Sequence, residues 1–376
     1  MKAPDPKNDP LKSRWISRRS HVRPKTIGLT QEELIETSFL EPGQTLPLVI
    51  QPTLLRLSLP MWAANNRDFI QANCLKYGAI LFRNFDTDAA AAFERAIEAI
   101  SGRALEYRER SSPRSKVQGN IYTSTDYPAE QTIFPHNEHS YALSVPLKLY
   151  FCCLLPAQQG GETPLADTRK VFTRIDPGIR DRFIEKKWMY VRNFGDGFGL
   201  DWQTVFQTTD PTVVEEYCKR GRIEYEWKDR NRLRTRQVRP AVARHPYTGE
   251  MVWFNHATFF HISTLAAPIR EGLLSELKTE DLPNNTYYGD GTDIEPAVLD
   301  ELRTAYLEES VAFEWKQGDV VLLDNMLTAH ARRPFLGPRK VIFGMAEPYT
   351  RTDIQLEAAE LGPPIDSHEE LTNGNH

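Results

Sequence analysis

The sequence predicts a mainly β protein with flanking helices, arranged as a double-stranded β-helix, the cupin-like jelly roll, with insertions. Two observations predict this fold. Short runs of β-branched and aromatic residues, bounded by Gly, Pro or Asp, recur over most of the 376-residue chain. Amphipathic helical patterns are fewer, and they lie between these runs as cover for the strands.

Five runs carry the strand prediction. Each is short, apolar and rich in β-branched or aromatic side chains, which is typical of strands. The runs span residues 79–82, 149–154, 251–254, 319–323 and 341–345.

Four segments with apolar residues at three- and four-residue spacing predict helices. They span residues 88–100, 167–175, 211–220 and 295–307. The third has the clearest start, because Asp210 suits the N-cap and Pro211 suits the first helical position. The aromatic segment 202–206 is interpreted as ordinary packing, with a lid as the alternative.

The two ends of the chain differ from its middle. Residues 1–45 carry eight Lys and Arg side chains among several prolines, which predicts a mobile basic N-terminal arm. Residues 353–376 are polar and acidic and predict a frayed tail. We therefore expect a single jelly-roll domain over residues 46–352.

Composition excludes some classes of function. The formal net charge is -5, with 40% hydrophobic and 26% charged residues, so the balance gives no support to nucleic acid or a membrane surface as a partner. The four cysteines form no CxxC pair, and no apolar run approaches the roughly 20 residues that cross a bilayer. We expect a soluble, cytoplasmic protein.

A metal site is indicated by the segment His136-Asn137-Glu138, which precedes a predicted strand. Alternation along a strand would place His136 and Glu138 on the same side. An imidazole and a carboxylate are two of the three ligands in the facial triad of non-haem iron oxygenases, which requires a second imidazole. His330, just after the strand run 319–323, meets that requirement.

Several further motifs occur in a fixed order around these three residues. They are YGAILFRNF at 77–85, GGET at 160–163, HP at 245–246, TGE at 248–250, WFN at 253–255, and the stretch from Gly318 to Arg339. With them the chain resembles the taurine dioxygenase (TauD/TfdA) superfamily from about Leu59 to Tyr349. FPHNEHSY at 134–141 and the WFN motif resemble its SyrP-like branch, associated with syringomycin-type aspartate hydroxylation.

The resemblance implies a cofactor set. Fe(II) would be held by His136, Glu138 and His330, and 2-oxoglutarate and O2 would be the cosubstrates. Arg339 would hold the distal carboxylate of 2-oxoglutarate in a bidentate pair, with Thr163 as a hydrogen-bond partner. The chain departs from taurine dioxygenase in a shorter spacing from His330 to Arg339, and in Phe343, which replaces a second arginine of the family.

Candidate substrate residues lie in three places: before the HxE motif, around the WFN motif, and in the alternating stretch 232–240. The last is also interpreted as a solvated edge strand. His139 is expected to face away from the ligand side. The candidates are Asn120, Tyr122, Thr123, Asn255, His256, His261 and Arg236.

These features predict an Fe(II)/2-oxoglutarate-dependent dioxygenase of natural product biosynthesis that hydroxylates an unactivated C–H bond. The substrate would be an amino acid or a derivative, free or carried as a thioester on a peptidyl-carrier domain. The alternative is a desaturase or cyclising oxidase that uses the same site, and a more remote one is a non-catalytic jelly-roll binding protein. Because halogenases of the superfamily lack the carboxylate ligand, Glu138 favours hydroxylation over chlorination.

Overall fold

The computed structural model describes residues 32–87, 89–107, 114–125, 127–195, 197–229 and 231–351. The tail expected over residues 353–376 lies outside them, as do residues 1–31 of the expected basic arm. The end of that arm was placed too late, because Ile35–Phe39 forms strand β1, which pairs with β2 (Leu48–Pro52). Within the described ranges, no helix is long and apolar enough to cross a membrane.

The largest sheet contains eight strands among the described residues, in the order β1-β2-β3-β17-β7-β20-β5-β4. All neighbours are antiparallel except β2 and β3. Its further strands are β3 (Ala79–Phe82), β17 (Val320–Asp324), β7 (Ser144–Leu155), β20 (Lys340–Thr350), β5 (Ile121–Thr123) and β4 (Lys116–Gln118).

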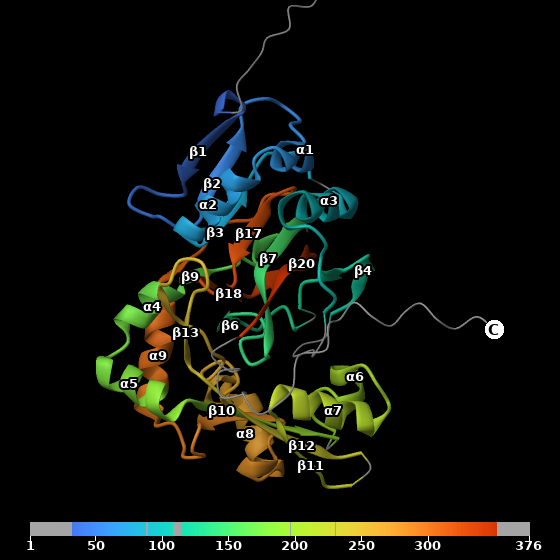
Figure 1. Cartoon of the computed structure of the whole chain (residues 1–376), viewed down its shortest axis with the longest axis vertical. Coiled ribbons are helices and arrows are strands. Elements are labelled where there is room, and N and C mark those ends of the chain that lie inside the picture. Colours follow the sequence, from blue (N-terminus) through green and yellow to red (C-terminus); the bar gives the residue numbers. More distant parts are fainter. Residues whose placement is uncertain are drawn as a thin grey trace, which may run out of the picture.

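Both faces of this sheet are buried at its centre, which explains why its strands are apolar runs rather than alternating ones. On β7, Tyr150 and Cys152 pack into one core, and Phe151 and Cys153 pack into a second core on the opposite face. The first core is covered by three helices, which Figure 1 shows gathered beside β1, β2 and β3. They are α1 (Leu59–Ala64), α2 (Arg67–Tyr77) and α3 (Ala90–Ser101).

A smaller sheet lies against the second core and has the order β16-β9-β18-β6. Its strands are β16 (Ser310–Val311), β9 (Leu165–Asp167), β18 (Thr328–Arg332) and β6 (Ile133–His136). In the antiparallel pair of β18 with β6, His330 lies opposite His136, and Arg332 lies opposite Ile133. Because two steps along β18 match three along β6, the pair contains a β-bulge.

A third sheet, with the order β11-β12-β10-β15, lies beside helices α6 and α7 (Figure 1). The stretch 232–240 is not the solvated edge strand expected from the sequence, because β12 pairs with β10 on one side and β11 on the other. Two of the three arginines on β12 are buried with partners: Arg234 donates to Asn193, and Arg239 donates to the Tyr141 carbonyl. The strands are β10 (Trp188–Phe194), β11 (Glu224–Trp227), β12 (Leu233–Arg239) and β15 (Asn284–Tyr288).

The remaining elements complete a mainly β fold with helical cover. Two short strand pairs join β13 (Val242–Arg244) to β14 (Met251–Trp253), and β8 (Gln159–Gly160) to β19 (Phe335–Leu336). The other helices are α4 (Thr168–Arg174), α5 (Pro177–Lys186), α6 (Trp202–Phe206), α7 (Pro211–Gly221), α8 (Ala267–Glu276) and α9 (Pro296–Glu308).

Candidate active site

Three side chains that can bind a metal converge at the end of the smaller sheet. His136, Glu138 and His330 are all buried, and their ligand atoms lie within 4.8 Å of one another. The two histidines face each other across the β6–β18 ladder, with ring centroids 4.3 Å apart. The backbone pairing therefore sets the spacing of two of the three groups.

Glu138 reaches the site from a turn and not from a strand, which corrects the expectation from alternation. Strand β6 ends at His136, and residues 138–140 form a turn. Asn325 holds this turn in place: its side chain accepts from the Glu138 N–H and donates to the Glu138 carbonyl, both at 2.8 Å. Asn325 was not singled out from the sequence, although it lies two residues after the predicted strand 319–323.

The turn between β17 and β18, which leads to His330, is fixed by Asp324. One carboxylate oxygen of Asp324 accepts the N–H groups of Met326 and Leu327. The other lies 2.8 Å from Lys148 Nζ and 3.3 Å from His245 Nε2. Burial alone would raise the pKa of Asp324, but Lys148 holds that pKa well below its usual range. A buried ion pair thus lies beneath the metal-capable residues.

The protonation of the two histidines suits metal binding. Burial lowers the pKa of both imidazoles, and that of His330 is lowered further by His136 and Arg114. Both rings are therefore neutral near pH 7, with a lone pair available. His136 Nδ1 lies 2.9 Å from the Phe134 carbonyl, which leaves Nε2 for a ligand bond. In His330, buried Nδ1 has no hydrogen-bond partner among the described residues, as expected where a metal ion is the missing partner.

The carboxylate of Glu138 is kept charged by Arg114. Burial alone would raise the pKa of Glu138, but Arg114 Nη2, 2.9 Å from Oε2, lowers it below its usual value. Tyr107 Oη donates to the other oxygen at 3.3 Å. Arg114 was not predicted, because it stands in a polar stretch with no motif around it.

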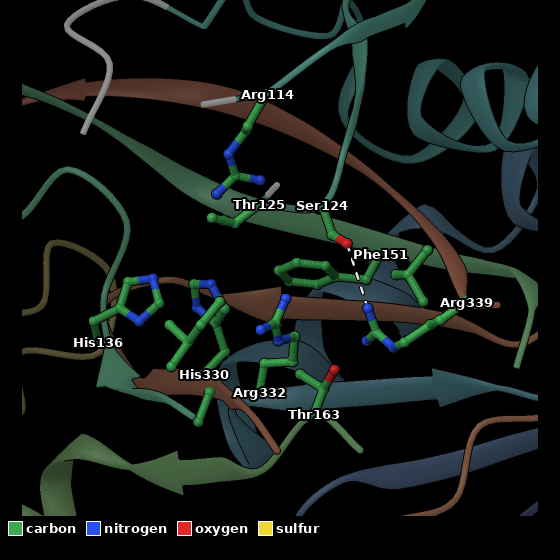
Figure 2. Close-up of a pocket in the computed structure, with 12 residues that line it drawn as sticks. Arg114, Ser124, Thr125, His136, Phe151, Thr163, His330, Arg332 and Arg339 are labelled. Atoms are coloured by element: carbon green, nitrogen blue, oxygen red, sulfur yellow. Dashed lines mark hydrogen bonds between the residues drawn. The ribbon is translucent and has the colours of Figure 1, made fainter. Parts of the chain in front are cut away.

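A cavity opens beside these residues, and Figure 2 shows how its lining side chains point into it. Two of the metal-capable residues, His136 and His330, form part of its wall. Three of the lining residues are arginines, and none is acidic. The lining consists of Arg114, Ser124, Thr125, Ile133, His136, Phe151, Thr163, His330, Ala331, Arg332, Arg339 and Val341.

Arg339 lies in this cavity beside Thr163, and no carboxylate is found among the residues that line the cavity (Figure 2). Its Nε donates to the Gly161 carbonyl at 3.1 Å, and its Nη1 donates to Ser124 Oγ at 3.4 Å. Burial, with a contribution from Arg332, lowers the pKa of Arg339 to about 10. The guanidinium still carries its charge at neutral pH, so the cavity suits a carboxylate ligand.

The glycine pair before Thr163 makes room for this arginine. Gly161 has a φ of 75°, and a Cβ there would lie 3.0 Å from both Cδ and Nε of Arg339. A larger residue would therefore strain the backbone and displace the guanidinium. Thr163 Oγ1 accepts from Trp315 Nε1 at 3.1 Å, which fixes its side chain at the cavity wall.

The structure brings one further histidine to the site. His256 is buried, its ring centroid lies 5.8 Å from that of His136, and its Nδ1 bonds to Ser140 Oγ at 2.5 Å. His139 does not face away as expected, because its Nε2 lies 3.7 Å from Glu138 Oε1 and its ring stacks on Tyr107.

None of the candidate substrate residues lines the cavity, and His256 is the one that lies beside a metal-capable residue. Asn120 donates to the Ala104 carbonyl, and Tyr122 Oη accepts from the Tyr107 N–H. Asn255 bonds to backbone groups, donating to the Ala241 carbonyl before β13 and accepting from the Ala257 N–H in its own loop.

Three more candidates serve local structure or face solvent. Thr123 Oγ1 accepts from the Ser115 N–H. His261 caps a short helix and bonds to Ser263. Arg236 is partly exposed on β12, 3.8 Å from Glu226.

Comparisons with known proteins identify the family of this chain. The family model described as taurine catabolism dioxygenase TauD, TfdA family matches residues 44–346. Dapdiamide synthesis protein DdaC from Enterobacter agglomerans is 40% identical over 271 residues, which cover 72% of this chain and 82% of DdaC. A clavaminate synthase-like protein from Arabidopsis thaliana is 28% identical over 319 residues, 80% of this chain and 93% of the relative.

Among solved structures, PvcB from Pseudomonas aeruginosa has a similar fold. The match has a TM-score of 0.52 and 14% sequence identity, and it covers 85% of this chain and 94% of PvcB. A second structure describes PvcB as an Fe, alpha-ketoglutarate dependent oxygenase from an isonitrile synthetic pathway. From the family model and the DdaC match together, the chain belongs to the TauD/TfdA family of Fe(II)/2-oxoglutarate-dependent dioxygenases.

Proposed function

We propose that this enzyme hydroxylates an unactivated C–H bond of an amino acid or an amino-acid-derived substrate, with decarboxylation of 2-oxoglutarate to succinate and CO2. One observation carries the proposal: the ligand set His136, Glu138 and His330 lies at the same cavity as Arg339, which has no carboxylate partner in the cavity lining. A metal site and an anion site thus adjoin, as a chelating dicarboxylate requires.

The proposal assigns a role to each of these groups. His136, Glu138 and His330 would hold Fe(II), since two neutral imidazoles and one carboxylate are its ligands in the facial triad. Arg339 and Thr163 would hold the distal carboxylate of 2-oxoglutarate. We also propose that the two sheets that pack over Phe151 form the double-stranded β-helix, with the metal ligands on the smaller sheet.

Bound iron and 2-oxoglutarate supply an oxidant that can take hydrogen from an unactivated C–H bond. The protein orients the reactants and excludes water. His136 and His330 are fixed by the β6–β18 ladder, and Glu138 is fixed by Asn325. All three are buried, so little solvent reaches the site.

Glu138 favours hydroxylation over halogenation. Its carboxylate is held by hydrogen bonds from Arg114 and Tyr107, so it remains beside the two histidines. A halide would need the position that this carboxylate takes. In chloride-rich buffer with oxygen-18 gas, we expect the wild-type product to gain labelled oxygen. A chlorine isotope pattern would contradict this, and loss of two hydrogens would indicate a desaturase.

The substrate class is supported by the relatives. DdaC is named as a dapdiamide synthesis protein, which supports a role in the synthesis of an amino-acid-derived natural product. The SyrP-like segment 134–141 supports a substrate carried on a peptidyl-carrier domain. Substrate-stimulated decarboxylation of 2-oxoglutarate, screened over free amino acids and their carrier-bound forms, distinguishes the two.

The metal assignment is tested first. We expect His136→Ala, Glu138→Ala and His330→Ala each to lose Fe(II) binding and 2-oxoglutarate turnover while the protein stays folded by circular dichroism. The matched control is His245→Gln, a buried histidine at the Asp324 ion pair that is not among the three ligands. Full Fe(II) occupancy in all three ligand variants would contradict the assignment.

A further inference from the structure

Arg114 is a second cation in the active site that has donors left over. Its side chain is 3% exposed, and Nη2 donates to Glu138. Nε and Nη1 are buried and have no hydrogen-bond partner among the described residues. Burying charged donors without acceptors is costly, so a ligand that accepts from these two nitrogens would be stabilised.

The surroundings of Arg114 hold its guanidinium in one orientation. Its Cζ lies 4.0 Å from the centroid of the Phe343 ring and 5.0 Å from that of Tyr107. Two aromatic rings fix the plane of the guanidinium and keep water from it, which strengthens its hydrogen bonds to a ligand. Phe343 stands where the family resemblance leads one to expect an arginine, so here the cation comes from another segment of the chain.

Arg114 and Arg339 serve different parts of the cavity. Figure 2 shows them reaching it from separate segments, Arg114 beside Thr125 and Arg339 beside Ser124 and Thr163. Arg339 and Thr163 are therefore placed for one carboxylate, and Arg114 is placed for another, close to Glu138.

The charges of the cavity lining favour a further anion. Three arginines line the cavity, and none of the other lining residues is acidic. Of the acidic side chains that act on these arginines, Glu138 is buried, whereas Glu162 is half-buried and Glu130 is exposed. Bound Fe(II) and 2-oxoglutarate carry opposite charges of equal size, so they cancel each other. A substrate carboxylate would therefore enter a lining that is positively charged, and it would compensate a buried cation.

We infer that Arg114 is a specificity-determining residue that binds a free carboxylate of the substrate through Nε and Nη1. This inference rests on the proposed function and narrows its substrate class to small amino-acid-like carboxylic acids. A substrate whose only carboxylate is converted to a thioester does not fit. A carrier-bound substrate fits if its side chain has a second carboxylate.

Binding is the test, with Fe(II) and 2-oxoglutarate present and oxygen excluded. The probes are the protein amino acids paired with their α-carboxamides, together with the pairs aspartate and asparagine, and glutamate and glutamine. Calorimetry gives the dissociation constants for the wild type and Arg114→Gln. We expect at least one carboxylate to bind the wild type more tightly than its amide. Arg114→Gln should weaken the binding of that carboxylate by about 10- to 100-fold and leave the binding of the amide unchanged.

Tyr107→Phe is the matched control, because it removes a hydrogen bond to Glu138 and keeps the ring beside Arg114. It should preserve the preference for carboxylate over amide. A merely structural role of Arg114 would weaken both members of a pair equally in Arg114→Gln, which would overturn the inference.

Two other outcomes of this binding experiment would also overturn the inference. Arg114→Gln could instead weaken the binding of 2-oxoglutarate and leave the affinities of the carboxylate and amide pairs unchanged. The carboxylate at Arg114 would then be that of 2-oxoglutarate, and the substrate assignment would be wrong. A panel in which no carboxylate is preferred over its amide, whether both bind or neither does, also overturns it. Failure of the proposed function has a different signature, since the wild type would then bind neither Fe(II) nor 2-oxoglutarate.

Discussion

Arg339 is a half-buried guanidinium that bonds to a carbonyl and a hydroxyl but to no carboxylate in the cavity lining. Both of these hydrogen-bond partners are neutral acceptors, so much of its hydrogen-bonding strength is free for a charged ligand. A bidentate carboxylate matches its planar fork, which a lysine cannot reproduce.

We therefore expect Arg339→Ala to weaken the binding of 2-oxoglutarate by about 10- to 100-fold, because a charge-assisted hydrogen bond is lost. Arg339→Lys should recover part of this loss. Calorimetry with 2-oxoglutarate on the metal-loaded protein measures both. Unchanged affinity in the two variants would move the carboxylate site to Arg332, which lines the same cavity.

His261 gives a pH dependence of stability. Its Nδ1 accepts from the Ser263 N–H, and burial, with a contribution from Arg303, lowers its pKa to about 4 from the usual 6.5. Because the folded state disfavours the charged ring, the contribution is fully present above pH 6.5 and is lost as the pH falls towards 4. Its size is on the order of 1–3 kcal/mol.

Urea unfolding of the metal-free protein at pH 7.5 and pH 5 checks this. His261→Asn keeps an acceptor at the N-cap and removes the titration, so it should lose less stability between the two pH values than the wild type. The ligand histidines titrate equally in both proteins. An equal loss in the two would show that His261 does not contribute.

The sequence predicted the residues whose positions follow from a motif and missed those that act across the fold. His136, Glu138, His330, Arg339 and Thr163 all lie at or beside the cavity. Asn325 and Arg114 were missed because their roles exist only through contacts. Asn325 bonds to a residue 187 positions away, and nothing in the sequence near either residue indicates its partner.

At the scale of elements, the turn after β17 connects the two parts of the metal site. Asn325 ties this turn to the Glu138 turn, and Asp324 ties it to Lys148 on β7. The strand β18 that follows carries His330. One turn thus positions ligands from two distant segments.

Asn325→Ala should therefore lower metal affinity by about 10- to 100-fold, the usual effect of losing a residue that orients a ligand. It also leaves the Glu138 N–H and carbonyl without their partner, so stability should fall by about 1–3 kcal/mol. Metal titration and urea unfolding measure the two effects. Asn73→Ala on the surface of α2 is the control. Wild-type metal affinity in Asn325→Ala would contradict this role.

Most predicted elements exist, and the differences have physical causes. The run 79–82 is β3. The segment 211–220 is α7, which extends one residue further than predicted, to Gly221. The helix expected over 167–175 is α4, which begins at Thr168 because Asp167 is its N-cap. Strand β12 was misjudged because alternating arginines indicate solvent exposure unless their buried partners on other elements are known.

At the scale of the whole molecule, the proposed metal site joins segments that are about 190 residues apart in the chain. The turn after β6 and the strand β18 meet there, and the larger sheet lies behind them through Phe151, whose ring centroid is 5.0 Å from that of His330. A ligand that binds these groups together binds the folded state in preference to the unfolded one.

Binding should therefore raise the thermal midpoint. A metal and 2-oxoglutarate each at 100 times its dissociation constant would each stabilise the fold by about 2.7 kcal/mol. For a chain of this size the midpoint should rise by several degrees, and a chelator should reverse the change. In Glu138→Ala, the metal-dependent part of this rise in the thermal midpoint should be absent. An unchanged midpoint in the wild type would show that the site does not bind these ligands.

The bulge in β6 has a consequence for how this chain tolerates insertion and deletion. Ile133 and His136 are an odd number of positions apart, so in a regular strand they would point to opposite faces. Both line the cavity, because three steps along β6 match two along β18. Deleting Pro135 would restore regular alternation and turn one of the two away. A single substitution between Ile133 and His136 keeps this register, whereas a change of length by one residue turns either Ile133 or His136 out of the cavity, so the number of residues here is more constrained than their identity.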